Sequence, residues 1–107
     1  MADIIPARGR VYWADLGGSI GRRPWIVISE NVRNRNLLNV TAVMMTTTRK
    51  DLPNWVEMGP QDPVPGFANC EHVETVHRDE ISADAGALTR ETMRRVEEAF
   101  KRAHCLD

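Results

Sequence analysis

An arginine and a pair of threonines are the side chains best suited to chemistry in this sequence. Arg23 stands directly before Pro24, at the start of an apolar run, and Thr46 and Thr47 end a later apolar run. Neighbouring strands would bring these ends together and place a guanidinium fork beside two hydroxyl groups. Such a set binds phosphate oxygens and stabilises negative charge that develops on phosphorus. The same residue types also occur on inert surfaces, so the pattern alone leaves both interpretations open.

The histidines and cysteines do not have the spacing of a metal centre. Cys70, His72 and His77 lie close together in the sequence. His104 adjoins Cys105, but no paired C-x-x-C or H-x-x-x-H spacing is present. The sequence also lacks a G-x-S-x-G nucleophile motif, a P-loop and a dinucleotide fingerprint. We therefore expect no metal and no cofactor, and two free thiols.

Stretches rich in β-branched and aromatic residues predict five short strands, followed by one helix. The strands are expected at residues 8–16, 24–28, 40–45, 55–58 and 68–76. The polar residues 29–39 and the proline-rich residues 59–66 are expected to be loops. From Thr89, which is placed to cap the first turn, apolar residues recur at helical spacing.

This order of elements predicts a mainly β fold with a C-terminal helix, built as a small SH3-like β-barrel against which the helix packs. The chain has 107 residues and a mass of 12.1 kDa, so we expect residues 1–107 to form a single domain. A domain of this size has a modest core and gains from sharing an apolar face. We therefore expect a homodimer.

Charge is distributed unevenly along the chain. The first fifty residues carry eight basic and three acidic side chains, a net charge of +5, and the remaining residues carry six basic and twelve acidic, a net charge of −6. The basic half is consistent with a phosphate-bearing ligand or with a solvated surface. The N-terminus lacks the apolar core of a signal peptide, and the longest apolar run is too short to cross a bilayer, so we expect a cytoplasmic protein.

Several sequence blocks, taken in order, resemble one protein family. They are RGRVYWADL at 8–16, GRRPWIVIS at 21–29, NR at 34–35, VMMTT at 43–47, LPNWVE at 52–57 and CEHVETV at 70–76. These blocks resemble the MazF/PemK/Kid family of toxin endoribonucleases, whose patterns include R-G-[DE]-[IV]-[WY]-x-x-x-L and R-P-x-[LV]-[IV]-[IV]. The resemblance covers nearly the whole chain. It implies the MazF/CcdB type of barrel and a dimer that binds an antitoxin.

The resemblance also implies roles for individual residues. Arg23 occupies the position of the family's catalytic arginine, and Thr46 and Thr47 occupy the positions that end the third strand. Glu71 falls on the acidic residue proposed as general base in part of the family. The residues expected to bind substrate are Ser19, Arg22, Arg49, Leu52, Pro53, Asn54 and His72, of which Leu52 to Asn54 match a loop that touches RNA bases.

The sequence departs from the family pattern at two places. The loop at residues 17–22 is shorter than usual and lacks the G-x-E-Q segment that shapes the RNA groove. Some members carry an arginine, assigned as general acid, where this chain has Asn69. A different group must then protonate the leaving oxygen, and Arg23 and His72 are the candidates.

We therefore expect a metal-independent, sequence-specific endoribonuclease that cleaves single-stranded RNA, as the toxin of a type II toxin–antitoxin pair. The expected partners are RNA, a MazE-like antitoxin and a second copy of the chain, without a membrane. One alternative is a toxin of the same fold, like CcdB, that binds DNA gyrase and has no enzymatic activity. Another is an SH3-like binding module that uses the aromatic side chains of Tyr12, Trp13, Trp25 and Trp55.

Overall fold

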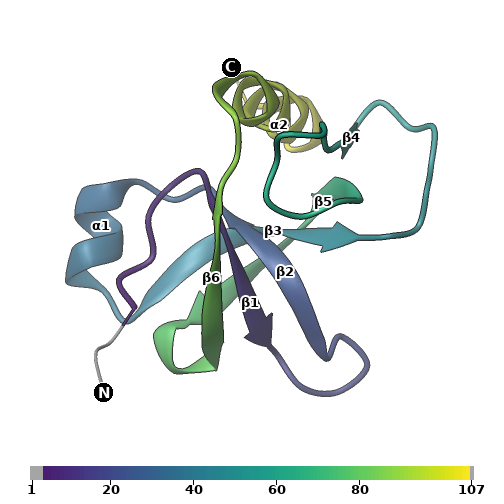
Figure 1. Ribbon diagram of the computed structural model, residues 1–107. Helices are drawn as coiled ribbons and strands as arrows, with labels where there is room; N and C mark the ends of the chain where they lie inside the picture. Colours follow the sequence, from purple (N-terminus) through teal and green to yellow (C-terminus); the bar gives the residue numbers. More distant parts are fainter. Residues whose placement is uncertain (1–3, 107) are drawn as a thin grey trace.

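The computed structural model describes residues 4–106, so four positions of the predicted 1–107 domain lie outside the described residues. Over this range, six strands form one sheet that carries a long helix near one end (Figure 1). The strands are β1 (Arg10–Asp15), β2 (Arg22–Val27), β3 (Asn39–Thr46), β4 (Trp55–Glu57), β5 (Phe67–His77) and β6 (Ile81–Ala87). The helices are α1 (Asn31–Asn36), the 3-10 turn η1 (Arg78–Glu80) and α2 (Arg90–Ala103).

The strands run in the order β4-β5-β3-β2-β1-β6, and every neighbouring pair is antiparallel. Within the described residues β4 and β6 remain unpaired edges. The mainly β class with a C-terminal helix is confirmed, but the sheet does not close into a barrel. Successive residues of β1 face opposite sides of the sheet, with Val11 in the apolar cluster under α2 and Tyr12 in a second cluster on the other face.

Residues 29–39 contain a short helix, α1, where the sequence predicted only a surface connection. Glu30 caps this helix, because its carboxylate accepts hydrogen bonds from the backbone N–H groups of Val32 and Arg33. Asn34 is fully buried, and its Nδ2 donates to the Ser29 carbonyl at 2.8 Å. The prediction was wrong because polar contacts, rather than an apolar stripe, hold this helix in place.

The sixth strand, β6, was not predicted from the sequence. Its residues are small or polar and none is fully buried, so ISADAGA lacks the apolar alternation that marks a half-buried strand. It forms by pairing with β1, with register shifts on either side of the Tyr12 and Trp13 pairs. Partner contacts, rather than its own composition, therefore determine this strand.

The second strand begins at Arg22, two residues before the predicted start at Pro24. Arg22 pairs with Asp15 of β1, and Pro24 pairs with Trp13. Proline has no backbone N–H, so Pro24 cannot donate a hydrogen bond to β3 on the other side of β2. The ladder between β2 and β3 accordingly begins only at Trp25, one residue after Pro24.

The C-terminal helix α2 begins where the sequence predicted. The Thr89 side chain accepts a hydrogen bond from the Thr92 backbone N–H at 3.2 Å, which caps the helix. Val96 and Ala99 are fully buried against the sheet. The helix therefore covers the apolar face that carries Val11. No helix of the described residues is both long and apolar enough to span a membrane.

Candidate active site

A cavity of about 460 Å³ lies where β2 and β3 separate. It gathers residues from five segments: β1, the β1–β2 turn, the start of β2, the end of β3 and the loop that precedes β5. Its lining residues are Trp13, Ile20, Arg22, Arg23, Pro24, Met45, Thr46, Thr47, Val64 and Pro65. Four residues predicted from the sequence as catalytic or substrate-binding, Arg22, Arg23, Thr46 and Thr47, thus come together here.

Strand register explains why an arginine and a threonine meet in this cavity. Trp25 of β2 pairs with Met44 of β3, so continuing the same antiparallel register by two residues places Arg23 opposite Thr46. Adjacent strands lie about 4.8 Å apart, which is within reach of these side chains. Because Pro24 interrupts the ladder, the strands separate at this point and leave room between them. The sheet therefore places the two residues side by side without closing the space above them.

The Arg23 side chain is half-buried and oriented by its neighbours. Its backbone pairs with Ala14 of β1, and the following Pro24 restricts that backbone to extended conformations. The Nε atom donates a hydrogen bond to the Ile20 carbonyl at 3.0 Å. No hydrogen bond or ion pair joins its two terminal nitrogens to another described residue. The guanidinium is thus held at one nitrogen and can bind an anion through the others.

Thr46 ends β3 and forms part of a tight turn. Its Oγ1 accepts a hydrogen bond from the Thr48 backbone N–H at 3.1 Å, which leaves the hydroxyl hydrogen available to donate to a ligand. Thr47 follows at the exposed rim of the cavity. The two threonines therefore differ, because only the Thr46 hydroxyl is held by the backbone.

Of two residues predicted to bind substrate near the β1–β2 turn, Arg22 lines the cavity and Ser19 does not. The Arg22 guanidinium carbon lies 4.5 Å from the centroid of the Trp13 ring, a cation–π contact at the cavity rim. Ser19 is exposed and does not line the cavity, whereas its neighbour Ile20 does. The short turn closes on itself, since the Gly21 N–H donates to the Gly17 carbonyl at 3.1 Å. Its few residues leave only Ile20 facing the cavity.

Glu71 lies outside the lining of the cavity, on a bulge of β5. Val43 pairs with Val73 and Met44 pairs with Asn69, so residues 70–72 have no partner on β3. The Glu71 side chain is exposed, and its backbone N–H donates to the side-chain oxygen of Asn69 at 3.1 Å. A substrate must therefore extend across β3 to contact both Arg23 and Glu71.

His72 lies on the same bulge and faces back toward β2. Its ring packs edge-on against Trp25, with centroids 6.0 Å apart and an interplanar angle of 71°. Trp25 is two residues from Arg23 along β2, so both side chains project from one face of the sheet. The His72 Nε2 also lies 2.9 Å from a carboxylate oxygen of Glu74. This distance allows a hydrogen bond that orients the His72 ring.

Arg49 lies in the loop that follows β3 and does not line the cavity. Its side chain is 66% exposed and forms long ion pairs with Asp51 at 3.8 Å and Glu57 at 3.6 Å. The guanidinium also lies 5.6 Å from the centroid of the Phe67 ring. Such exposed pairs contribute little to stability, so this side chain can change partners when a ligand binds.

Leu52, Pro53 and Asn54 form the remainder of that loop, beside α2. Leu52 is 48% exposed, and the Pro53 carbonyl accepts a hydrogen bond from Arg102 at 2.8 Å. The Asn54 side-chain oxygen is buried without a hydrogen-bond partner among the described residues, while its backbone carbonyl accepts from the Cys70 N–H at 2.9 Å. The loop is therefore anchored at its end and exposed at its tip.

Six apolar lining residues were not predicted as part of this site: Trp13, Ile20, Pro24, Met45, Val64 and Pro65. Trp13 pairs with Pro24, and the Ile20 carbonyl accepts the Arg23 hydrogen bond, so both lie beside Arg23. Val64 and Pro65 come from the proline-rich loop 59–66, and each lies 18 residues after one of the two threonines (64 − 46 and 65 − 47). No spacing in the sequence connects that loop to Arg23, so its contribution could not be derived.

The described histidines, cysteines and carboxylates do not gather in one cluster, and the two thiols differ in their surroundings. Between residues 4 and 106, no group of three or more His, Cys, Asp or Glu side chains is placed to hold a metal ion. Cys70 is fully buried, and burial raises the pKa of its thiol to about 12. Such a thiol stays protonated at neutral pH and packs as a small apolar group. Cys105 is a second free cysteine and is exposed.

A second cavity, of about 300 Å³, lies away from these residues. It is lined by Ile4, Leu38, His77, Arg78 and Asp79 and contains none of the residues predicted for catalysis or substrate binding. Two further cavities along α2, of about 210 and 680 Å³, also contain none of those residues. The cavity beside Arg23 is therefore the candidate active site.

Known proteins share both the sequence and the fold. Endoribonuclease MazF4 of Mycobacterium tuberculosis is 44% identical over 98 residues, which cover 92% of this chain and 91% of the relative. An endoribonuclease solved in complex with its cognate antitoxin, from a mycobacterial species, is 43% identical with a TM-score of 0.90, covering 95% of this chain and 97% of the other. MazF of Deinococcus radiodurans is 20% identical with a TM-score of 0.86, covering 97% and 100%, and shows the fold alone.

Residues 7–104 match the family described as PemK-like, MazF-like toxin of type II toxin-antitoxin system. The match includes the strands that carry Arg23 and Thr46, and also α2. The chain belongs to this PemK/MazF toxin family.

Proposed function

We propose that this chain is a metal-independent endoribonuclease that cleaves single-stranded RNA at chosen sequences, inhibits translation and growth, and acts in the cytoplasm as the toxin of a type II toxin–antitoxin pair. The observation that carries the proposal is the cavity in which Arg23 and Thr46 face each other across separating strands. Relatives of nearly equal length that are named endoribonucleases support it. Their names do not favour the gyrase-binding alternative.

The reaction assigned to this cavity needs no nucleophile from the protein. The ribose 2′-oxygen attacks the adjacent phosphorus, the bond from phosphorus to the 5′-oxygen breaks, and the products are a 2′,3′-cyclic phosphate and a 5′-hydroxyl. The protein must stabilise the charge on the non-bridging oxygens and transfer protons. Arg23 binds those oxygens through its terminal nitrogens, and the Thr46 hydroxyl donates a further hydrogen bond. Thr47 serves the same phosphate from the rim.

Proton transfer is assigned to groups at the edge of the cavity. Glu71 removes the 2′ proton, which requires RNA to cross β3 and reach the β5 bulge. The leaving 5′-oxygen receives its proton from His72 or from Arg23. The contact of His72 with Trp25, on the face of β2 that carries Arg23, and its pairing with Glu74 support the histidine.

Residues around the cavity are assigned to substrate binding. Arg22 lines the cavity from the start of β2, Ser19 lies nearby on the β1–β2 turn, and the exposed loop after β3 supplies Arg49, Leu52, Pro53 and Asn54. An exposed, weakly paired loop suits base recognition, because unstacked bases need adaptable polar and apolar contacts. This loop therefore determines which RNA sequence is cleaved.

The proposed partners follow from the same surface. A second copy of the chain forms a homodimer and extends the RNA groove, and a MazE-like antitoxin covers that groove with an extended acidic segment. Support comes from the related endoribonuclease solved with its cognate antitoxin. Sedimentation of the free protein at micromolar concentration should give a dimer, and added antitoxin should stop RNA cleavage. Undiminished cleavage in the complex would contradict this arrangement.

The test of the function uses one defined RNA and the purified protein. Cleavage should persist in EDTA, because no step uses a metal ion. Replacing the single ribose at the cleaved position by deoxyribose should abolish that cut while RNA binding remains nearly unchanged. Cleavage of the deoxy substrate, or loss of activity in EDTA that added divalent metal restores, would contradict the proposal.

A further inference from the structure

The loop at residues 59–66, here called the strap, forms one wall of the Arg23 cavity. It leaves the end of β4, passes the first turn of α2 and returns to the start of β5. Val64 and Pro65 of the strap line the same cavity as Arg23. The strap has no regular secondary structure, so contacts outside the sheet must hold this wall in place.

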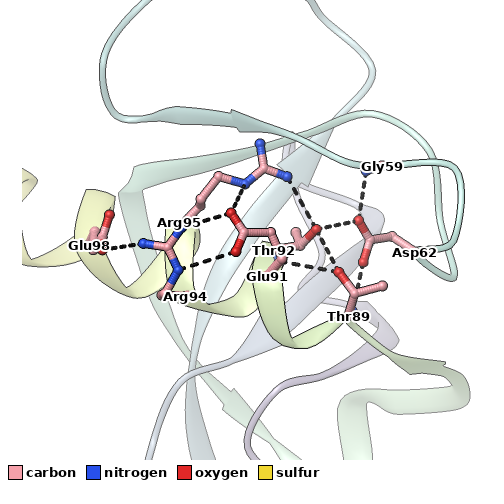
Figure 2. Close-up of polar contacts among 8 residues, drawn as sticks. All are labelled: Gly59, Asp62, Thr89, Glu91, Thr92, Arg94, Arg95 and Glu98. Atoms are coloured by element: carbon pink, nitrogen blue, oxygen red, sulfur yellow. Dashed lines mark hydrogen bonds and ion pairs between the residues drawn. The ribbon is translucent and has the colours of Figure 1, made fainter.

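A single carboxylate, that of Asp62, fastens the strap to α2 (Figure 2). One oxygen accepts a hydrogen bond from the Thr89 backbone N–H at 2.8 Å. The other accepts from the Thr92 hydroxyl at 2.7 Å and from the Gly59 backbone N–H at 2.7 Å. Burial raises the pKa of Asp62, but these hydrogen bonds outweigh burial and lower it below the usual value. The carboxylate is therefore ionised at neutral pH and binds three donors at once.

Two glycines, Gly86 and Gly66, let the strap pack closely on its neighbours before and after Val64. A Cβ on Gly86 of β6 would lie 3.1 Å from the Cβ of Pro63, and Gly86 has φ +125°. A Cβ on Gly66 would lie 2.6 Å from the Thr46 carbonyl oxygen. The strap thus packs on β6 at one end and directly on the backbone of Thr46 at the other. We expect a displacement at Asp62 to reach Val64 and Pro65, because these residues follow it directly in the chain.

We propose that Asp62 is a positioning residue of the RNA-binding cavity, which holds the Val64–Pro65 wall against the Arg23 side by tying the strap to the first turn of α2. The inference rests on the proposed function and adds a residue that does not line the cavity. It assigns Asp62 to the geometry of RNA binding rather than to the chemical step. Its loss lets the wall move away from bound RNA while Arg23, held by β1 and Ile20, stays in place.

The variant that tests this is Asp62→Asn, which keeps the size of the side chain but replaces one acceptor oxygen by a donor group. At least one of the three donors then loses its partner. The matched control is Glu97→Gln on α2 itself, where the carboxylate accepts a hydrogen bond from Arg8 at 2.7 Å and does not line the cavity. Thr92→Val is a milder variant that removes only the hydroxyl donor.

Single-turnover cleavage of one defined RNA separates binding from chemistry. In Asp62→Asn we expect the RNA concentration at half-maximal rate to rise about tenfold, with the maximal rate within about threefold of the parent, because binding geometry is lost while Arg23 is undisturbed. Thr92→Val should show a smaller rise in the same direction, and Glu97→Gln should show none. Hydrogen exchange of the Gly59 and Thr89 amides should accelerate in Asp62→Asn alone.

The outcomes distinguish this inference from the proposed function. Suppose that the parent cleaves RNA and that Arg23→Ala abolishes cleavage. If Asp62→Asn and Thr92→Val then both bind RNA as the parent does, the assignment of Asp62 fails and the proposed function stands. Equal losses in Glu97→Gln and Asp62→Asn would also overturn it, since that pattern reflects general destabilisation. If Asp62→Asn does not fold, Thr92→Val decides the question by the same measurement. A parent that does not cleave RNA at all would refute the proposed function itself.

Discussion

The cavity beside Arg23 and the loop after β3 are both assigned to RNA, yet they are built in opposite ways. Arg23 is held by a strand pair, by the proline that follows it and by a hydrogen bond to Ile20 at 3.0 Å. In the loop, Leu52 is 48% exposed and Arg49 has only ion pairs of 3.6 and 3.8 Å. One region is fixed before substrate arrives, and the other is free to adapt.

This difference matches the separate demands of chemistry and recognition. Groups that stabilise a transition state must already be in place, because reorganising them during the reaction removes their benefit. Contacts to unstacked bases tolerate adjustment on binding, at some cost in affinity. We therefore expect substitutions in the cavity to lower the maximal rate and substitutions in the loop to change RNA affinity or sequence preference.

The largest expected effect is that of Arg23→Ala. Removing a preorganised donor from a transition state costs roughly 10² to 10³ in rate. Arg23→Lys should not restore the rate, because an ammonium cannot reproduce the two-pronged guanidinium. Single-turnover cleavage at saturating RNA measures both variants. A rate within tenfold of the parent in Arg23→Ala would place the chemistry outside this cavity.

Thr46→Val should give the next largest loss. The substitution keeps the shape of the side chain and removes a hydroxyl that the Thr48 N–H holds in place. We expect a loss on the order of tenfold in the maximal rate, smaller than for arginine because the hydroxyl is uncharged. Thr47→Val is the matched control at the exposed rim and should lose less. The reverse order would mean that Thr47 faces the phosphate.

Leu52→Ala should have a smaller effect, confined to binding. The side chain is 48% exposed, so its loss does not disturb the core. We expect RNA affinity to fall by about threefold or the cleaved sequence to change, with the maximal rate kept, because only a partly exposed contact is removed. Mapping the 5′ ends of the fragments reports the sequence. A loss of maximal rate equal to that of Arg23→Ala would erase the distinction between the two regions.

The last expected effect concerns the pH dependence of stability rather than RNA cleavage. The lowered pKa of Asp62 means that the unfolded chain binds its proton more readily than the folded chain. The Asp62 carboxylate therefore stabilises the folded state fully above about pH 5. This stabilisation is lost as the pH falls through the usual carboxyl pKa near 3.9 and toward the lowered pKa of the folded state. Denaturant unfolding should be measured from pH 7 to pH 3. The free energy of unfolding of the parent should exceed that of Asp62→Asn by about 1–2 kcal/mol at neutral pH, and by less in acid. A constant difference across this range would contradict the ionised carboxylate.

The sequence predicted the parts of the fold that local pattern determines. Strand periodicity located β1, β3 and β5, and Thr89 marked the start of α2. The family resemblance named Arg23 and Thr46, and the strand register explains why they meet. The helix α1 and the strand β6 were missed, because the first depends on polar contacts around Asn34 and the second on pairing with β1.

The strap marks the limit of what the sequence can predict about the site. Asp62 is one of three Asp or Glu residues between 51 and 70, and nothing in its neighbours links it to Thr89 or Thr92. Only the folded chain brings the loop, the first turn of α2 and the end of β3 together. The wall of the cavity is a product of tertiary structure, whereas Arg23 and Thr46 are placed by strands that the sequence already reveals.

The ends of the RNA fragments test the central claim most directly, namely that the Arg23 cavity cleaves RNA with the substrate's own 2′-hydroxyl. Purified protein and one defined RNA should be incubated in EDTA, and the termini analysed by mass spectrometry, with Arg23→Ala in parallel. The expected products carry a 2′,3′-cyclic phosphate and a 5′-hydroxyl, and they should be reduced at least a hundredfold in the variant. Fragments ending in a 3′-hydroxyl and a 5′-phosphate, or equal product from Arg23→Ala, would contradict the account.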